Sequence, residues 1–359
     1  MKILYLINYA GKAGTEKYVR EIAEFSQKQG TSVFFAYNIH GPLAEHFQER
    51  QIPSFQLTMR HPFDIKAARI LANICKKHKV DIIHAQYARE NYIAILAKIF
   101  GSGAHVVFTS HFHINNNFLW RCTNRIFTRA NGAIIAVCNS IKDLLVKNKV
   151  YPKKIYTVFN GVAPSYSPRP LPPLPFTFVT IGRLSPEKGL MFLLASVKLL
   201  TQTCTNNFKV LIAGDGEMLQ QIENYISDHE LSSYVELLGY CDPVPVLQKS
   251  HVYIGSSQSE GISYSVLEAM SQSLPVIATN LGGFPDIVNN KTNCGILVEY
   301  GDKEALANAM ETIMNDDMLY NQLSQNTLRT IESIFNIQTM ANLTYNIYKE
   351  LMSNDRQKR

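Results

Sequence analysis

A loop between a predicted strand and a predicted helix contains the residue types of a phosphate-binding site. It runs from Ile181 to Gly189 and reads Ile-Gly-Arg-Leu-Ser-Pro-Glu-Lys-Gly. Gly182 lets the backbone turn closely, the Arg183 guanidinium can donate to two oxygens at once, and Lys188 adds a second positive charge. Such cations would stabilise the negative charge that builds up on a departing diphosphate. A surface loop with ordinary charges is the alternative interpretation.

A second segment begins and ends with a glutamate, and a helix is predicted to start between the two. Its residues are Glu260, Gly261, Ile262, Ser263, Tyr264, Ser265, Val266, Leu267 and Glu268. A helix that begins near Ser263 would direct its free N–H groups at a phosphate. Glu268, two turns into the helix, can accept hydrogen bonds from ribose hydroxyls. Glu260 could bind the hydroxyls of a transferred sugar and stabilise positive charge at its anomeric carbon. The spacing of the two glutamates by itself means little.

The elements that would position these loops follow a β-α-β pattern in both halves of the chain. Short β-branched runs alternate with longer amphipathic stretches, which is typical of doubly wound parallel sheets. The expected strands are Lys2 to Ile7, Ser32 to Ala36, Ile82 to Ala85, His105 to Ser110, Ala133 to Val137, Ile155 to Val158, Phe176 to Ile181, Lys209 to Ala213, Val235 to Leu238, Val252 to Ile254 and Pro275 to Ala278. The expected helices include Leu190 to Leu200, Met218 to Asp228 and Asn336 to Met352. Ligands of such sheets bind beyond the carboxyl ends of the strands, where both loops lie.

A cluster of prolines predicts the boundary between two domains. The chain has 359 residues and 46% hydrophobic content, enough for two cores. Six of its 15 prolines are Pro164, Pro168, Pro170, Pro172, Pro173 and Pro175. This density excludes a helix and favours an extended connector. We therefore expect a first domain at 1–165, a second at 166–335, and a C-terminal helix at 336–359 that packs back towards the first domain.

The charge of the chain is unevenly distributed. Residues 1–170 contain 23 Lys and Arg against 9 Asp and Glu, a formal charge of +14, whereas the remainder contains 12 against 20, or −8. A basic first half would attract an anionic partner such as phospholipid, lipid phosphate or nucleic acid. A basic surface without a specific partner is an equal alternative.

Two compositional features bear on the compartment. The six cysteines are scattered singly with no Cys-x-x-Cys pair, which is typical of reduced, structural thiols. The apolar run near the amino terminus is too short for a signal-peptide core, and no run reaches the roughly 18 residues of a membrane span. We therefore expect a cytoplasmic protein.

In combination, these motifs make the chain resemble family 4 of the glycosyltransferases, retaining enzymes of the GT-B fold. The hallmarks of that family are the Gly-Arg…Lys-Gly loop and the Glu-x7-Glu pair, and the resemblance extends nearly end to end. Further matches are Gly14-Thr15-Glu16, Asp81-Ile82-Ile83-His84, Thr109-Ser110-His111, Asn160-Gly161-Val162, Ala213-Gly214-Asp215-Gly216, Leu238-Gly239-Tyr240, Pro275-Val276-Ile277-Ala278-Thr279 and Gly282-Gly283. The resemblance implies an α/β GT-B fold, with two doubly wound Rossmann-like domains that face one another across a cleft.

The resemblance also implies an activity and a donor site. A sugar would pass from a nucleotide-sugar donor, UDP- favoured over GDP-, to a saccharide or lipid-linked acceptor in bacterial-type synthesis of cell-surface polysaccharide or glycolipid. Arg183 and Lys188 would bind the donor diphosphate and Glu268 the ribose. Glu260, with the backbone of residues 261–264, would bind the transferred sugar and the distal phosphate.

Other roles implied by the resemblance fall outside these two motifs. Gly239 and Tyr240 would lie beside the nucleotide base. Gly14 and Thr15, in the loop after the first strand, would close over the phosphates. His111 would point at the donor sugar as a catalytic residue, together with Arg183, Lys188 and Glu260; a physical argument alone leaves an ordinary buried or surface histidine open.

No metal and no cofactor are expected beyond the nucleotide-diphosphate sugar as co-substrate. His111 and His113 have a His-x-His spacing that suggests a metal site in other contexts. The Asp-x-Asp motif with which metal-dependent sugar transferases hold a divalent cation is absent from the sequence. The cationic pair of Arg183 and Lys188 can take over that electrostatic task.

A basic segment after His113 suggests a contact with membranes. Arg121, Arg125 and Arg129 are spaced four apart, on one face of a predicted helix with aromatic neighbours. Such a face would rest on an anionic membrane, at its inner surface, while the enzyme acts on a lipid-linked acceptor. The alternative is a helix with a solvated basic face, packed against the fold by its apolar side chains Phe118, Cys122 and Phe127.

The working mechanism is a front-face transfer, because no residue stands where a covalent nucleophile would be needed. Three other functions remain open. A nucleotide-sugar 2-epimerase of the same fold would need no acceptor, and a non-catalytic nucleotide-sugar binding protein would use the same loops. A nicotinamide-dependent dehydrogenase is disfavoured because Gly11-x-x-Gly14 is not the Gly-x-Gly-x-x-Gly fingerprint. No nucleic-acid partner is expected from the resemblance.

Overall fold

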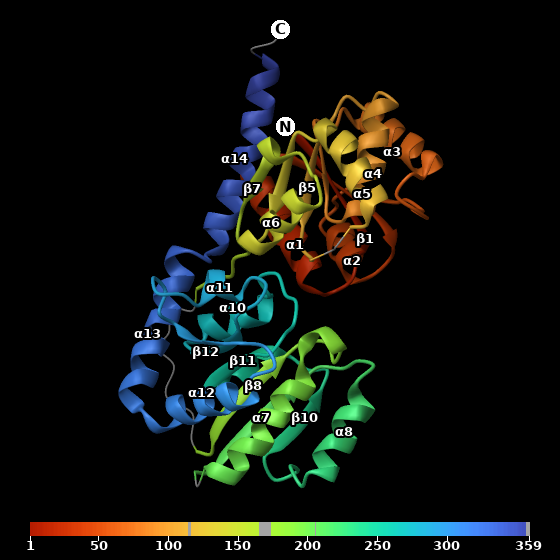
Figure 1. Ribbon diagram of the computed structural model, residues 1–359. Helices are drawn as coiled ribbons and strands as arrows, with labels where there is room; N and C mark the ends of the chain where they lie inside the picture. Colours follow the sequence, from red (N-terminus) through yellow and green to blue (C-terminus); the bar gives the residue numbers. More distant parts are fainter. Residues whose placement is uncertain (114–115, 165–173, 205, 357–359) are drawn as a thin grey trace. The chain divides into compact units, whose positions relative to one another are not determined.

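The computed structural model describes residues 1–113, 116–164, 174–204 and 206–356, which form two compact units (Figure 1). One unit comprises Met1–Asn160 and Ile337–Arg359, and the other comprises Gly161–Asn336. The chain thus crosses between the units at residues 160/161 and 336/337. The predicted boundary at residue 165, and the connector prolines at 168, 170, 172 and 173, lie outside the described residues.

The first unit is built on a seven-stranded parallel sheet with the order β3-β2-β1-β4-β5-β6-β7. The strands are β1 (Lys2–Tyr9), β2 (Ser32–Ile39), β3 (Ser54–Gln56), β4 (Ile82–Ala85), β5 (His105–Ser110), β6 (Ala133–Ala136) and β7 (Ile155–Thr157). The strand order reverses between β1 and β4, which makes the sheet doubly wound. The loops that follow these strands are therefore where ligands of such a sheet bind.

Helices cover both faces of this sheet. They are α1 (Gly14–Lys28), α2 (Pro42–Glu49), α3 (Ile65–His78), α4 (Ala88–Ile99), α5 (Phe118–Phe127), η1 (Thr128–Ala130), α6 (Asn139–Lys147), η2 (Pro152–Lys154) and α14 (Ile337–Arg356). The structure differs from the sequence-based expectation for Gly14 and Thr15, because they form the first turn of α1 and not a loop. The described helices include none with the length and hydrophobicity of a transmembrane span.

The C-terminal helix α14 packs on α1 and is fixed to the first sheet by a buried histidine. The Tyr348 hydroxyl lies 2.6 Å from His84 Nδ1, and His84 Nε2 lies 2.7 Å from the Thr109 hydroxyl. Burial lowers the pKa of His84 to about 3, so its ring is neutral and has one donor and one acceptor nitrogen. Residues at the end of the chain thereby complete the core of the first unit.

The second unit has a six-stranded parallel sheet with the order β10-β9-β8-β11-β12-β13. Its strands are β8 (Phe176–Ile181), β9 (Phe208–Ala213), β10 (Val235–Gly239), β11 (Val252–Gly255), β12 (Val276–Thr279) and β13 (Gly295–Val298). Its helices are η3 (Pro186–Lys188), α7 (Leu190–Thr203), α8 (Leu219–Asp228), α9 (Pro243–Gln248), α10 (Tyr264–Ser271), α11 (Phe284–Ile287), α12 (Lys303–Asn315) and α13 (Asp317–Ser333). The order reverses between β8 and β11, so these two neighbours begin the two halves of the sheet.

Every strand predicted from the sequence is present, and two strands were missed. Both β3 and β13 lie at a sheet edge and are only three and four residues long. Their side chains are mostly half-buried, because an edge strand has a neighbour on one side only. Strands of three or four residues contain too few positions for a periodic pattern of burial, and that pattern is the signal on which the prediction depended.

Candidate functional site

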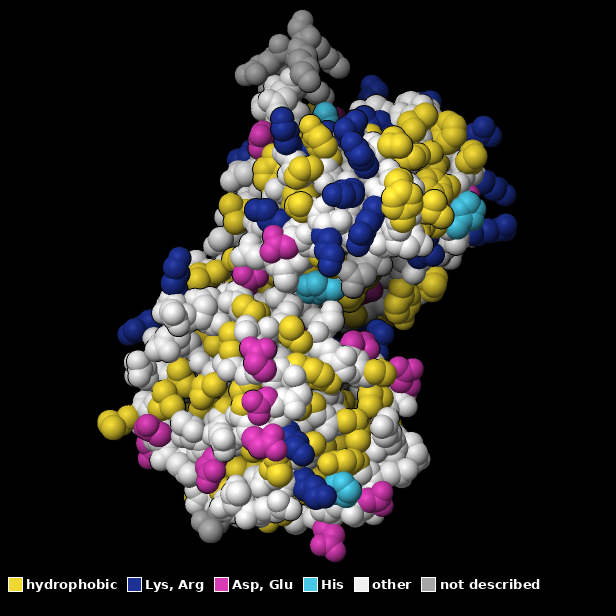
Figure 2. Space-filling model, viewed as in Figure 1, with side chains coloured by type: hydrophobic (Ala, Val, Ile, Leu, Met, Phe, Trp, Pro, Cys, Tyr) yellow, Lys and Arg dark blue, Asp and Glu magenta, His cyan; other side chains and the backbone are white. Residues whose placement is uncertain are grey.

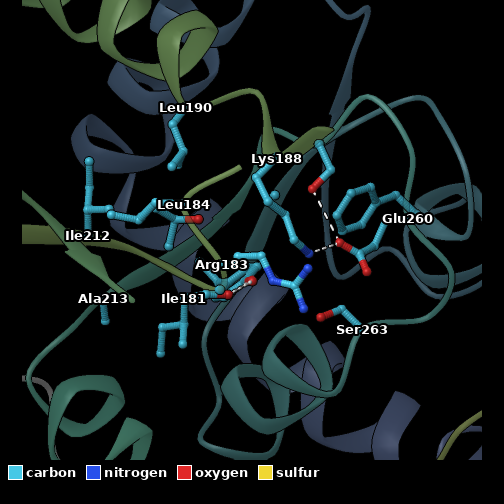
Figure 3. Close-up of a pocket in the computed structure, with 15 residues that line it drawn as sticks. Ile181, Arg183, Leu184, Lys188, Leu190, Ile212, Ala213, Glu260 and Ser263 are labelled. Atoms are coloured by element: carbon cyan, nitrogen blue, oxygen red, sulfur yellow. Dashed lines mark hydrogen bonds and ion pairs between the residues drawn. The ribbon is translucent and has the colours of Figure 1, made fainter. Parts of the chain in front are cut away.

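The two motifs meet in one pocket of the second unit (Figure 3). Strands β8 and β11 are parallel neighbours, so the loops that leave their carboxyl ends start side by side. The first loop carries Arg183 and Lys188, and the second carries Glu260 and Ser263. The pocket is lined by Thr180, Ile181, Gly182, Arg183, Leu184, Lys188, Leu190, Ile212, Ala213, Tyr253, Gly255, Ser257, Glu260, Ser263 and Phe284.

An ion pair joins the two loops. Lys188 Nζ contacts Glu260 Oε2, although the residues are 72 positions apart in the chain. The side chains are 22% and 17% exposed, so the pair is partly withdrawn from water. The Ser257 hydroxyl donates to the same Glu260 oxygen at 3.4 Å, and the Ser256 hydroxyl donates to the Lys188 carbonyl at 2.9 Å. Both charges of the pair are therefore held in place.

Arg183 supplies a further positive charge on the same side of the pocket. Its side chain is exposed, and Figure 3 shows its guanidinium beside Lys188 and directed towards Ser263. A second carboxylate, that of Glu187, accepts a hydrogen bond from Ser185 at 2.7 Å. This bond lowers the pKa of Glu187, and the charges of Lys188 and Arg183 lower it further. Glu187 therefore stays ionised next to the cations, a feature that the sequence analysis did not single out.

Two glycines allow the loops to come this close. Gly189, with φ of +65°, follows Lys188 directly, and a Cβ there would overlap the Ser256 carbonyl oxygen. Gly282, with φ of +64°, lies against Glu260, and a Cβ there would overlap the Glu260 carbonyl oxygen. The neighbouring Gly283 donates its N–H to that same carbonyl at 2.9 Å. The position of Glu260 thus depends on a glycine that only the resemblance had marked.

The start of α10 lies at the floor of this pocket. Ser263 is its N-cap residue, but its side chain makes no capping bond; its hydroxyl instead lies 2.8 Å from the Ser265 hydroxyl. Ser265 in turn lies 2.8 Å from the hydroxyl of Tyr253. Burial raises the pKa of Tyr253, and the charges of Glu260 and Glu268 raise it further. Tyr253 therefore lies within electrostatic reach of both glutamates of the motif; in the sequence it appears only as a strand residue.

Several predicted site residues of the second unit do not line this pocket. Glu268 lies further along α10, and Gly261, Ile262 and Tyr264 contribute no lining surface; the side chains of Ile262 and Tyr264 are buried. Gly239 ends β10 with φ of +64°, and its carbonyl accepts the Gly214 N–H at 2.7 Å. Tyr240 beside it is 79% exposed. The structure thus brings Arg183, Lys188, Glu260 and Ser263 together in the pocket. The other predicted site residues of the second unit do not line it.

In the first unit, His111 is held by a glutamine that the sequence analysis missed. His111 follows β5 and is buried, and its Nε2 lies 3.0 Å from Gln86 Oε1. Gln86 follows the adjacent strand β4, and its amide nitrogen donates to the His84 carbonyl at 3.4 Å. A carbonyl only accepts, so Oε1 of Gln86 must face His111, and His111 Nε2 must carry the proton. Burial lowers the pKa of His111 to about 3, which leaves Nδ1 unprotonated at neutral pH.

A second pocket adjoins His111 and Gln86. Tyr87 and Phe112 stack at its side with ring centroids 5.9 Å apart, and Phe112 is 53% exposed. Thr15 of α1 is buried and does not line this pocket. The next residue, Glu16, is also buried, and burial raises its pKa. Gly14 and Thr15 therefore do not line this pocket, although Tyr18, further along α1, lies edge-on to the His111 ring with centroids 5.0 Å apart.

The second histidine of the His-x-His spacing has a different environment. His113 Nε2 lies 2.9 Å from the hydroxyl of Ser140, on α6. Within the described parts of the chain, no group of three or more His, Cys, Asp or Glu side chains is arranged to hold a metal ion.

Comparisons with known proteins match both units. Residues 13–166 match the model of glycosyltransferase family 4, and residues 168–330 match that of glycosyl transferases group 1. The UDP-Gal:alpha-D-GlcNAc-diphosphoundecaprenol alpha-1,3-galactosyltransferase of Escherichia coli is 27% identical over 346 residues, which cover 88% of each chain. A glycosyltransferase structure from Rickettsia africae ESF-5 has a TM-score of 0.82 at 21% identity, covering 98% of this chain and 99% of that one. Alr3699/HepE of Anabaena in complex with UDP also has a TM-score of 0.82, at 18% identity, covering 98% and 100%. The expected GT-B fold of two doubly wound Rossmann-like domains is confirmed.

The role of Gly282 can be tested against a matched glycine. Gly282→Ala should destabilise the second unit more than Gly301→Ala does, because Gly301 also has positive φ, at +93°, but has open space around its Cβ position. Backbone strain of about 1 kcal/mol is common to both variants. Thermal unfolding followed by circular dichroism measures the difference. Equal melting temperatures for the two variants would show that Glu260 does not depend on this close approach.

The tautomer of His111 gives a second prediction. Nitrogen-15 NMR should find Nε2 protonated and Nδ1 bare, with no protonation of the ring until the pH approaches about 3. Gln86→Met removes the acceptor and should abolish the preference for the Nε2–H tautomer. Gln56→Met, at an exposed glutamine of the same unit, is the control. An unchanged nitrogen spectrum in Gln86→Met would contradict the assignment.

Proposed function

Because this chain belongs to family 4 of the glycosyltransferases, we propose that it transfers a sugar from a UDP-sugar to a saccharide or lipid-linked acceptor, with retention of configuration and without a metal. The named activity of the Escherichia coli relative uses UDP-galactose and an acceptor linked to diphosphoundecaprenol. Alr3699/HepE has been solved with UDP-glucose. These two proteins supply the reason to favour UDP and a lipid-linked acceptor.

The observation that carries the proposal is the contact between Lys188 and Glu260. It brings a cationic loop and an acidic loop into one pocket at the point where the strand order of the second sheet reverses. A diphosphate needs cations, and a sugar needs a carboxylate that accepts hydrogen bonds from its hydroxyls. The pocket offers both within reach of a single nucleotide-sugar.

Arg183 and Lys188 contribute differently to binding the leaving diphosphate. Lys188 is already paired with Glu260, whereas the exposed guanidinium of Arg183 can turn to a diphosphate without breaking an ion pair. The backbone N–H groups at the start of α10 stabilise negative charge placed beyond that end of the helix, here the charge of the diphosphate. The Ser263 side chain does not cap them. As the bond to the sugar breaks, the charge that develops on the diphosphate is stabilised by these groups in place of a metal ion.

Retention follows from a front-face reaction. Glu260 Oε2 is engaged by Lys188 and by Ser257, which makes this carboxylate a poor covalent nucleophile. The acceptor hydroxyl attacks the face from which the diphosphate departs, and a diphosphate oxygen takes the proton of that hydroxyl. Glu260 stabilises the positive charge at the anomeric carbon. No cofactor takes part beyond the nucleotide-sugar itself.

The remaining assignments stay predictions on the basis of the resemblance. Glu268 binds the ribose, Gly239 and Tyr240 lie beside the base, Gly14 and Thr15 close over the phosphates, and His111 contacts the donor sugar. The pocket beside His111, with its Tyr87 and Phe112 rings, is suited to an acceptor sugar, because aromatic faces pack against the apolar faces of pyranose rings. Such an acceptor fits the synthesis of cell-surface polysaccharide or glycolipid, in the cytoplasm or at the inner face of the membrane.

The donor and the stereochemistry are tested together. UDP-sugars should raise the melting temperature more than GDP- or ADP-sugars and should be hydrolysed slowly without an acceptor. With an acceptor, proton NMR of the product should show the anomeric configuration of the donor, and EDTA should leave the rate unchanged. Three outcomes would contradict the proposal. An epimerised nucleotide-sugar formed from donor alone would support the 2-epimerase, and binding without turnover would support the non-catalytic binding protein. Stabilisation by NAD would support the dehydrogenase. Inversion, or loss of activity in EDTA, would contradict retention or metal independence.

The cationic pair gives a prediction of its own. Arg183→Ala and Lys188→Ala should each lower kcat/KM by roughly 10²–10³-fold, the usual effect of removing one group that stabilises transition-state charge. Lys249→Ala, at an exposed lysine of the same unit that does not line the pocket, is the control. Near-normal turnover in Arg183→Ala would remove this account of leaving-group stabilisation.

A further inference from the structure

The helix α5 turns apolar side chains to solvent. Phe118, Leu119 and Ile126 are 78%, 73% and 68% exposed, and Cys122 is exposed as well. The alternative interpretation, in which Phe118 and Cys122 pack against the fold, is therefore wrong for these two residues, whereas Phe127 does pack, against Tyr92 at a ring distance of 5.7 Å. An exposed cluster of large apolar side chains on one helix is typical of a surface that contacts a protein, a membrane or a ligand.

A buried polar residue explains why the helix has this orientation. Asn124 is 5% exposed and accepts a hydrogen bond from the Tyr92 hydroxyl. Its amide nitrogen donates to the Asn148 carbonyl at 2.9 Å, which ties α5 to the end of α6. Because these bonds satisfy Asn124 on the inner side, the opposite side of the helix must face outwards. That side carries Leu119, Cys122 and Ile126, which are three and four positions apart and so form one stripe.

Cations surround this stripe. Residues 112–160 contain eight Lys and Arg but only one acidic residue, Asp143. Arg125 and Arg129 are exposed beside the stripe. Lys154 Nζ donates to the Arg129 carbonyl at 2.7 Å, so its charge lies at the same end. Figure 2 shows hydrophobic side chains gathered over α3, α4 and α5, with Lys and Arg side chains around them.

We propose that the face formed by Phe118, Leu119, Cys122 and Ile126, with Arg125 and Arg129 beside it, docks the protein onto an anionic lipid bilayer. Apolar side chains on a basic helix enter the boundary between headgroups and acyl chains, while arginines bind the lipid phosphates. A second copy of the chain is a poorer partner, because a two-fold contact would bring the same cations together. Nucleic acid would use the arginines but gains little from exposed Leu and Ile, which cannot stack on bases as aromatic rings do.

Vesicle binding by the full chain tests the proposal without donor or acceptor, so its outcome is independent of the proposed function. In co-sedimentation, the protein should bind vesicles with about one third phosphatidylglycerol and not vesicles of phosphatidylcholine alone. The combined variant Phe118→Ser, Leu119→Ser and Ile126→Ser should bind about tenfold more weakly or worse. Arg125→Gln with Arg129→Gln should lose roughly fivefold per charge, and added salt should weaken binding of the unaltered chain.

Matched controls come from the second unit. Met318→Ser, at a side chain that is 83% exposed, and Lys303→Gln, at an exposed lysine, should bind vesicles as the unaltered chain does. All variants should keep their melting temperature. Turnover of a water-soluble acceptor should also be unchanged, since none of the substituted residues lines a described pocket.

Four results would overturn the proposal. The first is equal binding to neutral and anionic vesicles, or to neither. The second is vesicle binding that both α5 variants retain in full. The third is an oligomer in solution that the serine variant dissociates, which would assign the face to a second copy. The fourth is binding of a short DNA or RNA through α5 with no binding to vesicles.

Discussion

The site of the second unit depends on the ion pair between Lys188 and Glu260. The two charges come from loops that follow the neighbouring strands β8 and β11, and their partial burial makes the position of each dependent on the other. Glycines at 189 and 282 permit the required approach of the backbones. The pair leaves the charge of Arg183 available for an anion, so the pocket is organised before any ligand binds and needs little rearrangement to receive one.

The first unit organises its own residues with neutral groups. His84 and His111 are both buried, both have a pKa lowered to about 3 by burial, and both are held by hydrogen bonds to neutral partners. A neutral ring has one donor and one acceptor nitrogen. The carbonyl oxygen of Gln86 only accepts, so it fixes the tautomer of His111 as well as its position, whereas the hydroxyls of Tyr348 and Thr109 can donate or accept and fix the position of His84. The two units therefore use different physical means, charge pairing in one and directional hydrogen bonding in the other, to position their candidate functional residues.

The helix α5 depends on both hydrogen bonding and charge. A buried asparagine, satisfied by Tyr92 and by the backbone at Asn148, sets its orientation and leaves apolar side chains among cations at the surface. The excess of positive charge lies in the first half of the chain, while the pocket of Arg183, Lys188 and Glu260 lies in the second. A division of labour follows from our two proposals, in which one unit contacts the lipid that carries the acceptor and the other binds the nucleotide-sugar.

The sequence by itself determined the family, the class of enzyme and most of the sheets, and the family models confirm the first two. Strands such as His105–Ser110 and Phe176–Ile181 were predicted to the residue, because continuous β-branched runs reflect burial on both faces of a parallel sheet. Only the tertiary structure revealed Gln86, Tyr253 and the outward face of α5. Their importance lies in neighbours that are distant in sequence, since a hydrogen-bond partner or a buried side is set by how strands and helices pack and leaves no local pattern.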